Sequence, residues 1–158
     1  RVNRADSHYS EAQFLLGLGR YFTGDFAGAE SALRALAESL PLNEVWNNLA
    51  AAQSRRNRPE AVDNFRRALE GDESDPDYYF NLGYAQWKQG QFDAAAESFR
   101  ASLVRKPDDV EATLLLGRCL KKAGPRPGDA RSDGLERIKR NYEETAYRQL
   151  KAALEPKR

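Results

Sequence analysis

One dipeptide pattern recurs along the chain at a nearly constant interval and constrains the fold more than any other feature. A leucine followed by a small residue occurs four times, at intervals of 33, 33 and 34 residues: Leu16-Gly17, Leu49-Ala50, Leu82-Gly83 and Leu116-Gly117. Seven residues after each small residue stands a turn former, in order Gly24, Asn57, Gly90 and Gly124. Glycine and asparagine tolerate the positive φ at which many helices end, so each copy predicts two helices joined by a turn. Such a period is typical of stacked helix pairs.

The copy at residues 75–107 shows the pattern most clearly. Asp75-Pro76 predicts a helix start, because proline is tolerated in the first turn of a helix, and Lys106-Pro107 predicts the end of a second helix. The sequence resembles the tetratricopeptide-repeat family at Leu82, Gly83, Tyr84, Gly90, Phe92, Ala95, Phe99 and Pro107. The resemblance covers residues 8–124. It implies an all-α fold, a right-handed α-solenoid of antiparallel helix pairs whose first helices line a concave surface.

We expect one domain over residues 1–158. Its repeats are predicted at about 10–42, 43–75 and 76–109, with a partial repeat at 110–124 and a Gly/Pro-rich loop at 125–134. Asp133 followed by Glu136 resembles a helix-capping box, and apolar residues from Leu135 onward recur on one side at helical spacing. The sequence therefore predicts a long C-terminal helix over residues 135–154 that caps the stack.

The resemblance implies that the concave groove binds an extended or helical peptide. Asn48 and Asn81 would bond the peptide main chain, since each amide offers a donor and an acceptor. Aromatic rings of the third repeat would hold an apolar anchor, and basic residues of the fourth would meet carboxylates. The complete candidate set is Asn47, Asn48, Arg55, Phe80, Asn81, Tyr84, Trp87, Lys88, Arg118, Lys121 and Lys122.

Each of these features also has a purely structural interpretation. The asparagines would bridge neighbouring helices, and Trp87 would pack against the next helix instead of meeting a ligand. The basic residues of the fourth repeat would form a solvated charged face. Trp46 is predicted to lie in the core, and Cys119, the only cysteine, is predicted to be a buried and unreactive thiol.

The first predicted helix suggests a second function. It is apolar nearly all round, with Phe14, Leu18, Tyr21 and Phe22 among its residues. A helix of this kind is buried on more than one side. We expect a preceding domain, a second copy in a homodimer or a ligand to cover it. The alternative function is therefore an assembly module of a larger protein, which uses this helix and the C-terminal helix for its contacts.

Catalysis is not expected from this sequence. The single histidine, His8, stands near the start, and no nucleophile setting, phosphate-binding loop or metal-ligand spacing is present. We therefore expect a non-catalytic protein without metal or cofactor. The carboxylate clamp with which some family members bind acidic chaperone tails is not expected either, because Ala51, Glu111 and Leu115 occupy the slots where its basic residues are required.

Charge and hydropathy give further expectations. From Arg118 onward the chain carries twelve basic and six acidic residues, but the two signs are interleaved. This pattern favours helix-stabilising pairs over nucleic-acid binding. No apolar run approaches the roughly 18 residues of a membrane span. The sequence begins at Arg1 without methionine or signal-peptide pattern, so we expect a piece of a longer protein, and the compartment stays undetermined.

Overall fold

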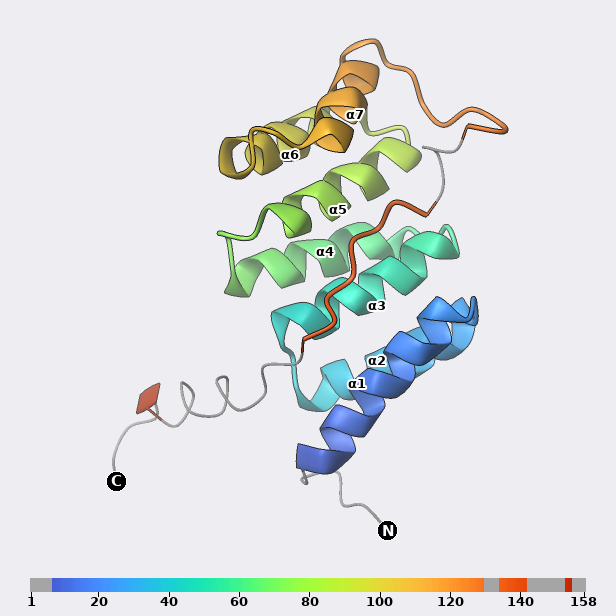
Figure 1. Ribbon diagram of the computed structural model, residues 1–158, viewed down its shortest axis with the longest axis vertical. Coiled ribbons are helices and arrows are strands. Elements are labelled where there is room, and N and C mark those ends of the chain that lie inside the picture. The colour runs from blue at the N-terminus through green and yellow to red at the C-terminus, as the bar shows by residue number, and fades with distance from the viewer. Residues whose placement is uncertain (1–6, 130–133, 142–152, 155–158) are drawn as a thin grey trace.

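The computed structural model describes residues 7–129, 134–141 and 153–154. Over residues 7–129 it is an all-α solenoid of antiparallel helix pairs, which confirms the predicted fold class (Figure 1). Seven helices follow one another in this range: α1 (Ser7–Phe22), α2 (Phe26–Ser39), α3 (Asn43–Arg55), α4 (Glu60–Gly71), α5 (Pro76–Lys88), α6 (Phe92–Arg105) and α7 (Val110–Leu120). None of them is long and apolar enough to cross a membrane.

The helices form two layers. Helix α1 pairs with α2, α3 with α4 and α5 with α6, and each pair packs on the next. The first helices of successive units, α1, α3, α5 and α7, also contact one another in order. They therefore form one continuous layer, and the remaining three helices form the other.

Aspartates and turn residues set the helix boundaries. The side chains of Asp25, Asp75 and Asp109 accept backbone hydrogen bonds at the starts of α2, α5 and α7, which satisfies amide groups that a helix start leaves free. Gly24, Asn57 and Gly90 have the positive φ expected of them. In the fourth unit Lys122, at φ 53, takes this conformation instead of the predicted Gly124.

In the first and third units, the small residue of the repeated dipeptide lies where the two helices of a pair approach closely. A Cβ added at Gly17 would come within 2.6 Å of Leu33 Cγ, and one added at Gly83 within 3.1 Å of Phe99 Cε1. At Gly117 nothing among the described residues lies within 4 Å of such a Cβ. The first and third copies therefore show why a repeat of helix pairs requires a small residue here.

The segment after the loop departs from the prediction. Residues 134–141, which we call the groove segment, are not helical. They cross the layer of first helices over α3 and α5 (Figure 1). The helix predicted from Leu135 was therefore wrong for residues 135–141, because their side chains bond to the solenoid and not to neighbours along a helix. Of the rest of that helix, only residues 153–154 are described, and these are helical; Asp133 also lies outside the described residues.

Candidate peptide-binding groove

Three buried asparagines hold the main chain of the groove segment. Asn81 on α5 accepts a hydrogen bond from the Arg137 N–H at 2.7 Å and donates to the Arg137 carbonyl at 2.7 Å. Asn48 on α3 makes the same pair of bonds to Lys139, at 2.8 and 2.7 Å. Asn47 donates to the Arg137 carbonyl at 2.9 Å. The backbone N–H and C=O groups of Arg137 and Lys139 are thus both hydrogen-bonded to side-chain amides. A neighbouring strand in a sheet would bond alternate residues in the same way.

The asparagines also bond to one another. Asn81 donates to Asn47 Oδ1 at 2.7 Å, and Asn47 donates to Asn48 Oδ1 at 3.2 Å. Bridging of neighbouring helices, one of the two alternatives that the sequence left open, therefore occurs together with contacts to the chain's own groove segment. Contact of these asparagines with a ligand stays a prediction. The mutual bonds fix the orientation of each amide, so the groove presents its donors and acceptors in one arrangement.

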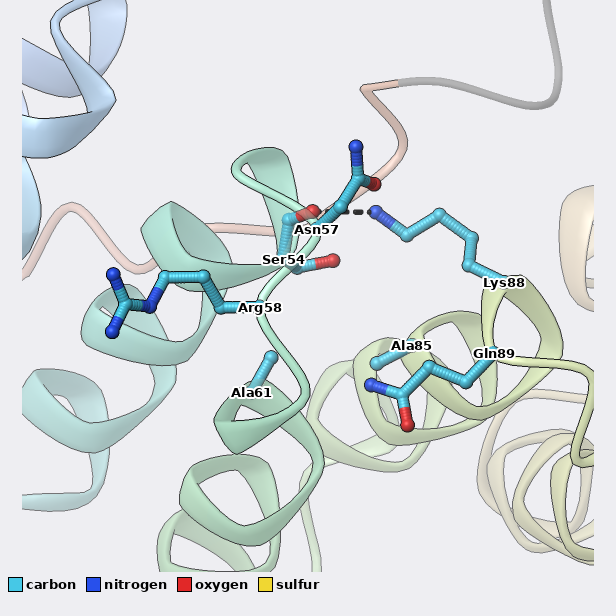
Figure 2. A pocket seen from close by; sticks show the side chains of 7 residues that line it. All are labelled: Ser54, Asn57, Arg58, Ala61, Ala85, Lys88 and Gln89. Carbon is cyan, nitrogen blue, oxygen red and sulfur yellow. Dashed lines mark hydrogen bonds between the residues drawn. The ribbon is translucent and has the colours of Figure 1, made fainter.

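Glu136 is received by a polar site at the ends of α3 and α5. Its side chain is fully buried, and its Oε1 accepts hydrogen bonds from Ser54 Oγ at 2.7 Å and from Lys88 Nζ at 2.9 Å. Lys88 also donates to the Ser54 carbonyl at 2.9 Å, the bond drawn in Figure 2. A buried carboxylate requires both a countercharge and hydrogen bonds; this site supplies both at Oε1, while the buried Oε2 has no hydrogen-bond partner among the described residues. Ser54 and Lys88 also border a cavity of about 200 Å³ between the α3–α4 turn and α5 (Figure 2).

Basic side chains of the groove segment face carboxylates at the starts of α5 and α7. Arg137 forms a two-pronged contact with Asp109, at 2.6 and 3.0 Å. Lys139 Nζ lies 2.6 Å from Asp75 and 3.0 Å from Asp77. The hydrogen bonds from Arg137 hold the pKa of Asp109 below its ordinary value. Burial opposes the charge on Lys139, but the bonds to Asp75 and Asp77 outweigh it and raise the pKa of Lys139.

Aromatic faces complete the two basic subsites. The guanidinium carbon of Arg137 lies 3.5 Å from the centroid of the Phe80 ring, and Lys139 Nζ lies 5.1 Å from that of Tyr78. Cations over ring faces gain electrostatic attraction where water is excluded. Burial, followed by nearby carboxylates, raises the pKa of Tyr78, so its hydroxyl stays neutral.

Two apolar side chains, Leu135 and Ile138, pack the groove segment against the solenoid. Leu135 packs against the core cluster of α5, α6 and α7. Ile138 packs against two clusters, one built around α1, α2 and α3 and one that extends to α4 and α5. Glu136 and Ile138 thus meet one set of neighbours, while Arg137 and Lys139 meet another. This alternation has the period of an extended chain.

The structure brings six of the predicted binding residues to the groove segment. Asn47, Asn48 and Asn81 bond its main chain, Lys88 bonds Glu136, and Phe80 lies under Arg137. Arg55 stands beside it, since a Cβ added at Gly134 would meet Arg55 at 2.7 Å. Arg55 also stacks on Phe26, with its guanidinium carbon 4.4 Å from the ring centroid.

The other predicted binding residues lie elsewhere. Tyr84 and Trp87 are fully buried in the core between α5, α6 and α7, and Trp87 Nε1 donates to the Ala123 carbonyl at 2.8 Å. Arg118 pairs with Asp129 and stacks over Trp87. Lys121 is exposed, and Lys122 lies 3.4 Å from Asp93 on the surface. In this structure Arg118, Lys121 and Lys122 make no hydrogen bond or ion pair to the described groove segment.

The first helix is less exposed than its sequence indicated. Phe14, Leu18 and Tyr21, named as contacts for another chain, are buried against α2 and α3 and cannot serve that role in this state. Phe22 is 54% exposed. Leu15 and Leu16 are further apolar residues that α1 exposes.

The structure also tests the core predictions for Trp46 and Cys119. Trp46 is partly buried and packs on the α1–α3 cluster, with Arg67 over its ring. Cys119 is a free, buried thiol, and burial raises its pKa to about 11.

Six residues of the groove were missing from the predicted set. They are Ser54, Asp75, Asp77, Tyr78, Asp109 and Glu111. Ser54 and Asp77 carry a usable signal, because they share the helix stripes of Asn48 and Asn81 at steps of three and four. Asp75 and Asp109 cap helices, and capping alone explains an aspartate at each position. The sequence therefore carried no separate signal for their contacts with Lys139 and Arg137.

The helix pairs and the asparagine-lined layer of first helices define a helical-repeat protein whose residues 134–141 lie across that layer. A sequence profile described as tetratricopeptide repeat matches residues 49–109 and 80–144. These matches span more than half of the sequence, so the chain belongs to the tetratricopeptide-repeat family. No curated protein matches the sequence.

Solved structures share the fold at low sequence identity. The TPR domain of Arabidopsis OM64 has a TM-score of 0.69 at 22% identity, over 72% of this chain and 96% of that one. The first TPR domain of Spaghetti (RPAP3), bound to the HSP90 peptide SRMEEVD, scores 0.70 at 19% identity, over 73% and 94%. The Yersinia enterocolitica type III secretion chaperone SycD, in complex with a peptide of the translocator YopD, scores 0.64 at 16% identity, over 76% and 93%.

Proposed function

We propose that the chain is a non-catalytic interaction module that binds an extended protein segment in its concave groove. The observation that carries the proposal is the set of paired bonds from Asn48 and Asn81 to the main chain of Lys139 and Arg137. Bonds to a main chain give affinity without depending on side-chain identity, as in strand addition to a sheet. Two proteins of the same fold hold peptides, one from HSP90 and one from YopD, which supports this use of the fold.

A peptide-library selection tests this function. The bait is the full chain carrying Ile138→Asp, which places a charge against the two apolar clusters and releases the groove segment. We expect the bait to retain peptides, and the same bait with Asn48→Ala and Asn81→Ala to lose them. Circular dichroism checks that both remain helical. Equal retention by both folded baits, or no retention by either, would contradict groove binding.

A separate observation supports assembly as a second candidate function. Leu15, Leu16 and Phe22 on α1 are 54%, 42% and 54% exposed, and neighbouring apolar side chains in water favour association. Light scattering of the full chain tests it. We expect an associated species that Leu15→Ser/Leu16→Ser converts to monomer, with Val104→Ser as the control for loss of an exposed apolar side chain on another helix. A monomer at every concentration would remove this candidate.

A further inference from the structure

Four successive side chains of the groove segment each meet a chemically matched site. We propose that the groove is selective for an extended segment with an acidic, a basic, an aliphatic and a basic residue in that order, and that Glu136, Arg137, Ile138 and Lys139 are an internal copy of the partner's recognition sequence. This inference rests on the proposed function. It goes beyond it by naming the kind of partner, a protein segment with net positive charge.

The acidic position is set by Lys88. Its side chain is 12% exposed, and its ammonium group lies 2.9 Å from the buried carboxylate of Glu136, which Ser54 also bonds. An amide in place of the carboxylate would keep the acceptor but leave the ammonium charge without a countercharge. An apolar side chain would leave both Lys88 and Ser54 without their partner. Unpaired buried groups of this kind are costly, so the site discriminates strongly.

The first basic position is shaped for arginine. Two nitrogens of the Arg137 guanidinium reach two oxygens of Asp109, while its plane lies over Phe80. Asp109 is 5% exposed, so water does not replace this partner. A lysine ammonium is a point charge and cannot make the same forked contact. This position therefore binds arginine in preference to lysine.

The second basic position is less demanding. Asp75 and Asp77 both bond the Lys139 ammonium group, and Tyr78 lies beneath it. These carboxylates come from one helix start and can meet either kind of cation. Between the two bases, the partly buried Ile138 packs against both the α1–α3 core cluster and the cluster that extends to α4 and α5. A branched aliphatic side chain fits there because it buries apolar area without a polar group to satisfy.

The carboxylates of the groove exclude one class of peptide. Asp75, Asp77, Asp109 and Glu111 all lie within 4.0 Å of a basic group of the groove segment. A peptide with acidic residues at these two positions would place like charges together in a site with restricted access to water. The groove therefore selects against acidic tails and in favour of basic segments.

The groove segment occupies the groove, so it competes with any partner for the same site. A segment of the same chain acts at an effective concentration that is on the order of millimolar for short connections. A partner must displace it, so the affinity measured with the unaltered chain is lower than the affinity of an empty groove. Releasing the groove segment should therefore strengthen binding of an external copy.

Fluorescence anisotropy with labelled peptides tests the inference. The native probe is the peptide of residues 134–141, Gly-Leu-Glu-Arg-Ile-Lys-Arg-Asn. The reversed probe has Arg137→Glu and Lys139→Glu. The released protein is the full chain with the same two substitutions. Its matched control carries Arg66→Glu and Arg100→Glu, a double charge reversal at exposed positions of α4 and α6.

We expect the native probe to bind the released protein at least about tenfold more tightly than it binds the unaltered chain or the control. The reversed probe should not bind the released protein. Equal binding of both probes to the released protein would overturn the selectivity but leave groove binding standing. No binding of either probe to a released protein that circular dichroism shows to be folded would overturn both proposals.

A second measurement uses the unaltered chain, so the test does not depend on folding of the variant. Excess native probe, added to the full chain, should exchange with the groove segment. We expect faster amide hydrogen exchange at Arg137 and Lys139, whose N–H groups then lose Asn81 and Asn48. The reversed probe at the same concentration should leave both rates unchanged. Acceleration by both probes, or by neither, would contradict the proposed selectivity.

Discussion

At the scale of the residue, the groove depends on side chains that serve two neighbours at once. Asn81 bonds both Asn47 and the main chain of Arg137. Asp109 caps α7 and also receives Arg137. Sequence reasoning found the asparagines because an amide on a concave stripe has a recognisable use. It could not find Asp109, because a capping role already accounts for an aspartate at that position.

Substitution of Trp87 should reduce the stability of the fold, because its ring lies in the core between α5, α6 and α7. Trp87 is fully buried, so Trp87→Ala should lower the free energy of unfolding by about 3–5 kcal/mol. Urea denaturation measures this loss. The matched control is Lys121→Ala at an exposed position near the end of α7, which should change stability by no more than about 0.5 kcal/mol. A Trp87→Ala protein as stable as the control would show that this ring is not part of the core.

The thiol of Cys119 should be unreactive in the folded chain. Burial raises its pKa to about 11, so little thiolate is present at neutral pH, and the side chain is 2% exposed. Alkylation with iodoacetamide should be slow in buffer and fast in concentrated urea. Labelling at the rate of a free thiol without denaturant would contradict the burial of this residue.

At the scale of the element, residues 134–141 show how tertiary contacts override a local pattern. The spacing of Leu135 and Ile138 fits a helix, and the charges beside them fit helical pairs. In the structure, however, the main chain bonds to Asn48 and Asn81, and the charges pair with other helices. The helices of the repeats were predictable because each carries its own periodicity and stop signals. The groove segment was not, since its partners are distant in sequence.

Docking of the groove segment should weaken in acid. Arg137 lowers the pKa of Asp109 from its ordinary value of 3.8 when the segment is docked. The contact therefore favours docking at pH values above about 3.8, and this contribution is lost as the pH falls through the lowered pKa. The side-chain amide resonances of Asn81, followed by NMR during an acid titration, report the change.

A variant isolates this effect. Asp109→Asn keeps a hydrogen-bond acceptor but removes the titrating charge, so its Asn81 resonances should show undocking at neutral pH or a shallower acid response. Asp63→Asn, an exposed carboxylate on α4, is the control and should titrate as the unaltered chain does. If the Asn81 resonances of the Asp109→Asn protein respond to acid as those of the control do, Asp109 is not the group that governs docking.

At the scale of the whole molecule, a regular stack of helix pairs creates a surface that no single unit contains. The first helices lie side by side, so Asn48 and Asn81 from successive units form one row along the concave layer. The repeat interval predicts this row, because equivalent positions of a solenoid recur on the same face. What occupies the row was not predictable from the interval, since it depends on residues outside the repeats.

Residue-resolved amide hydrogen exchange by NMR tests most directly that the groove holds an extended main chain. Arg137 and Lys139 donate their N–H groups to asparagines, while the Ile138 N–H has no hydrogen bond within the described part of the chain. We expect slow exchange at Arg137 and Lys139 and fast exchange at Ile138, with Asn81→Ala removing the protection of Arg137. Fast exchange at all three amides would show an empty groove, and slow exchange at all three would show a helix; either result would contradict this account.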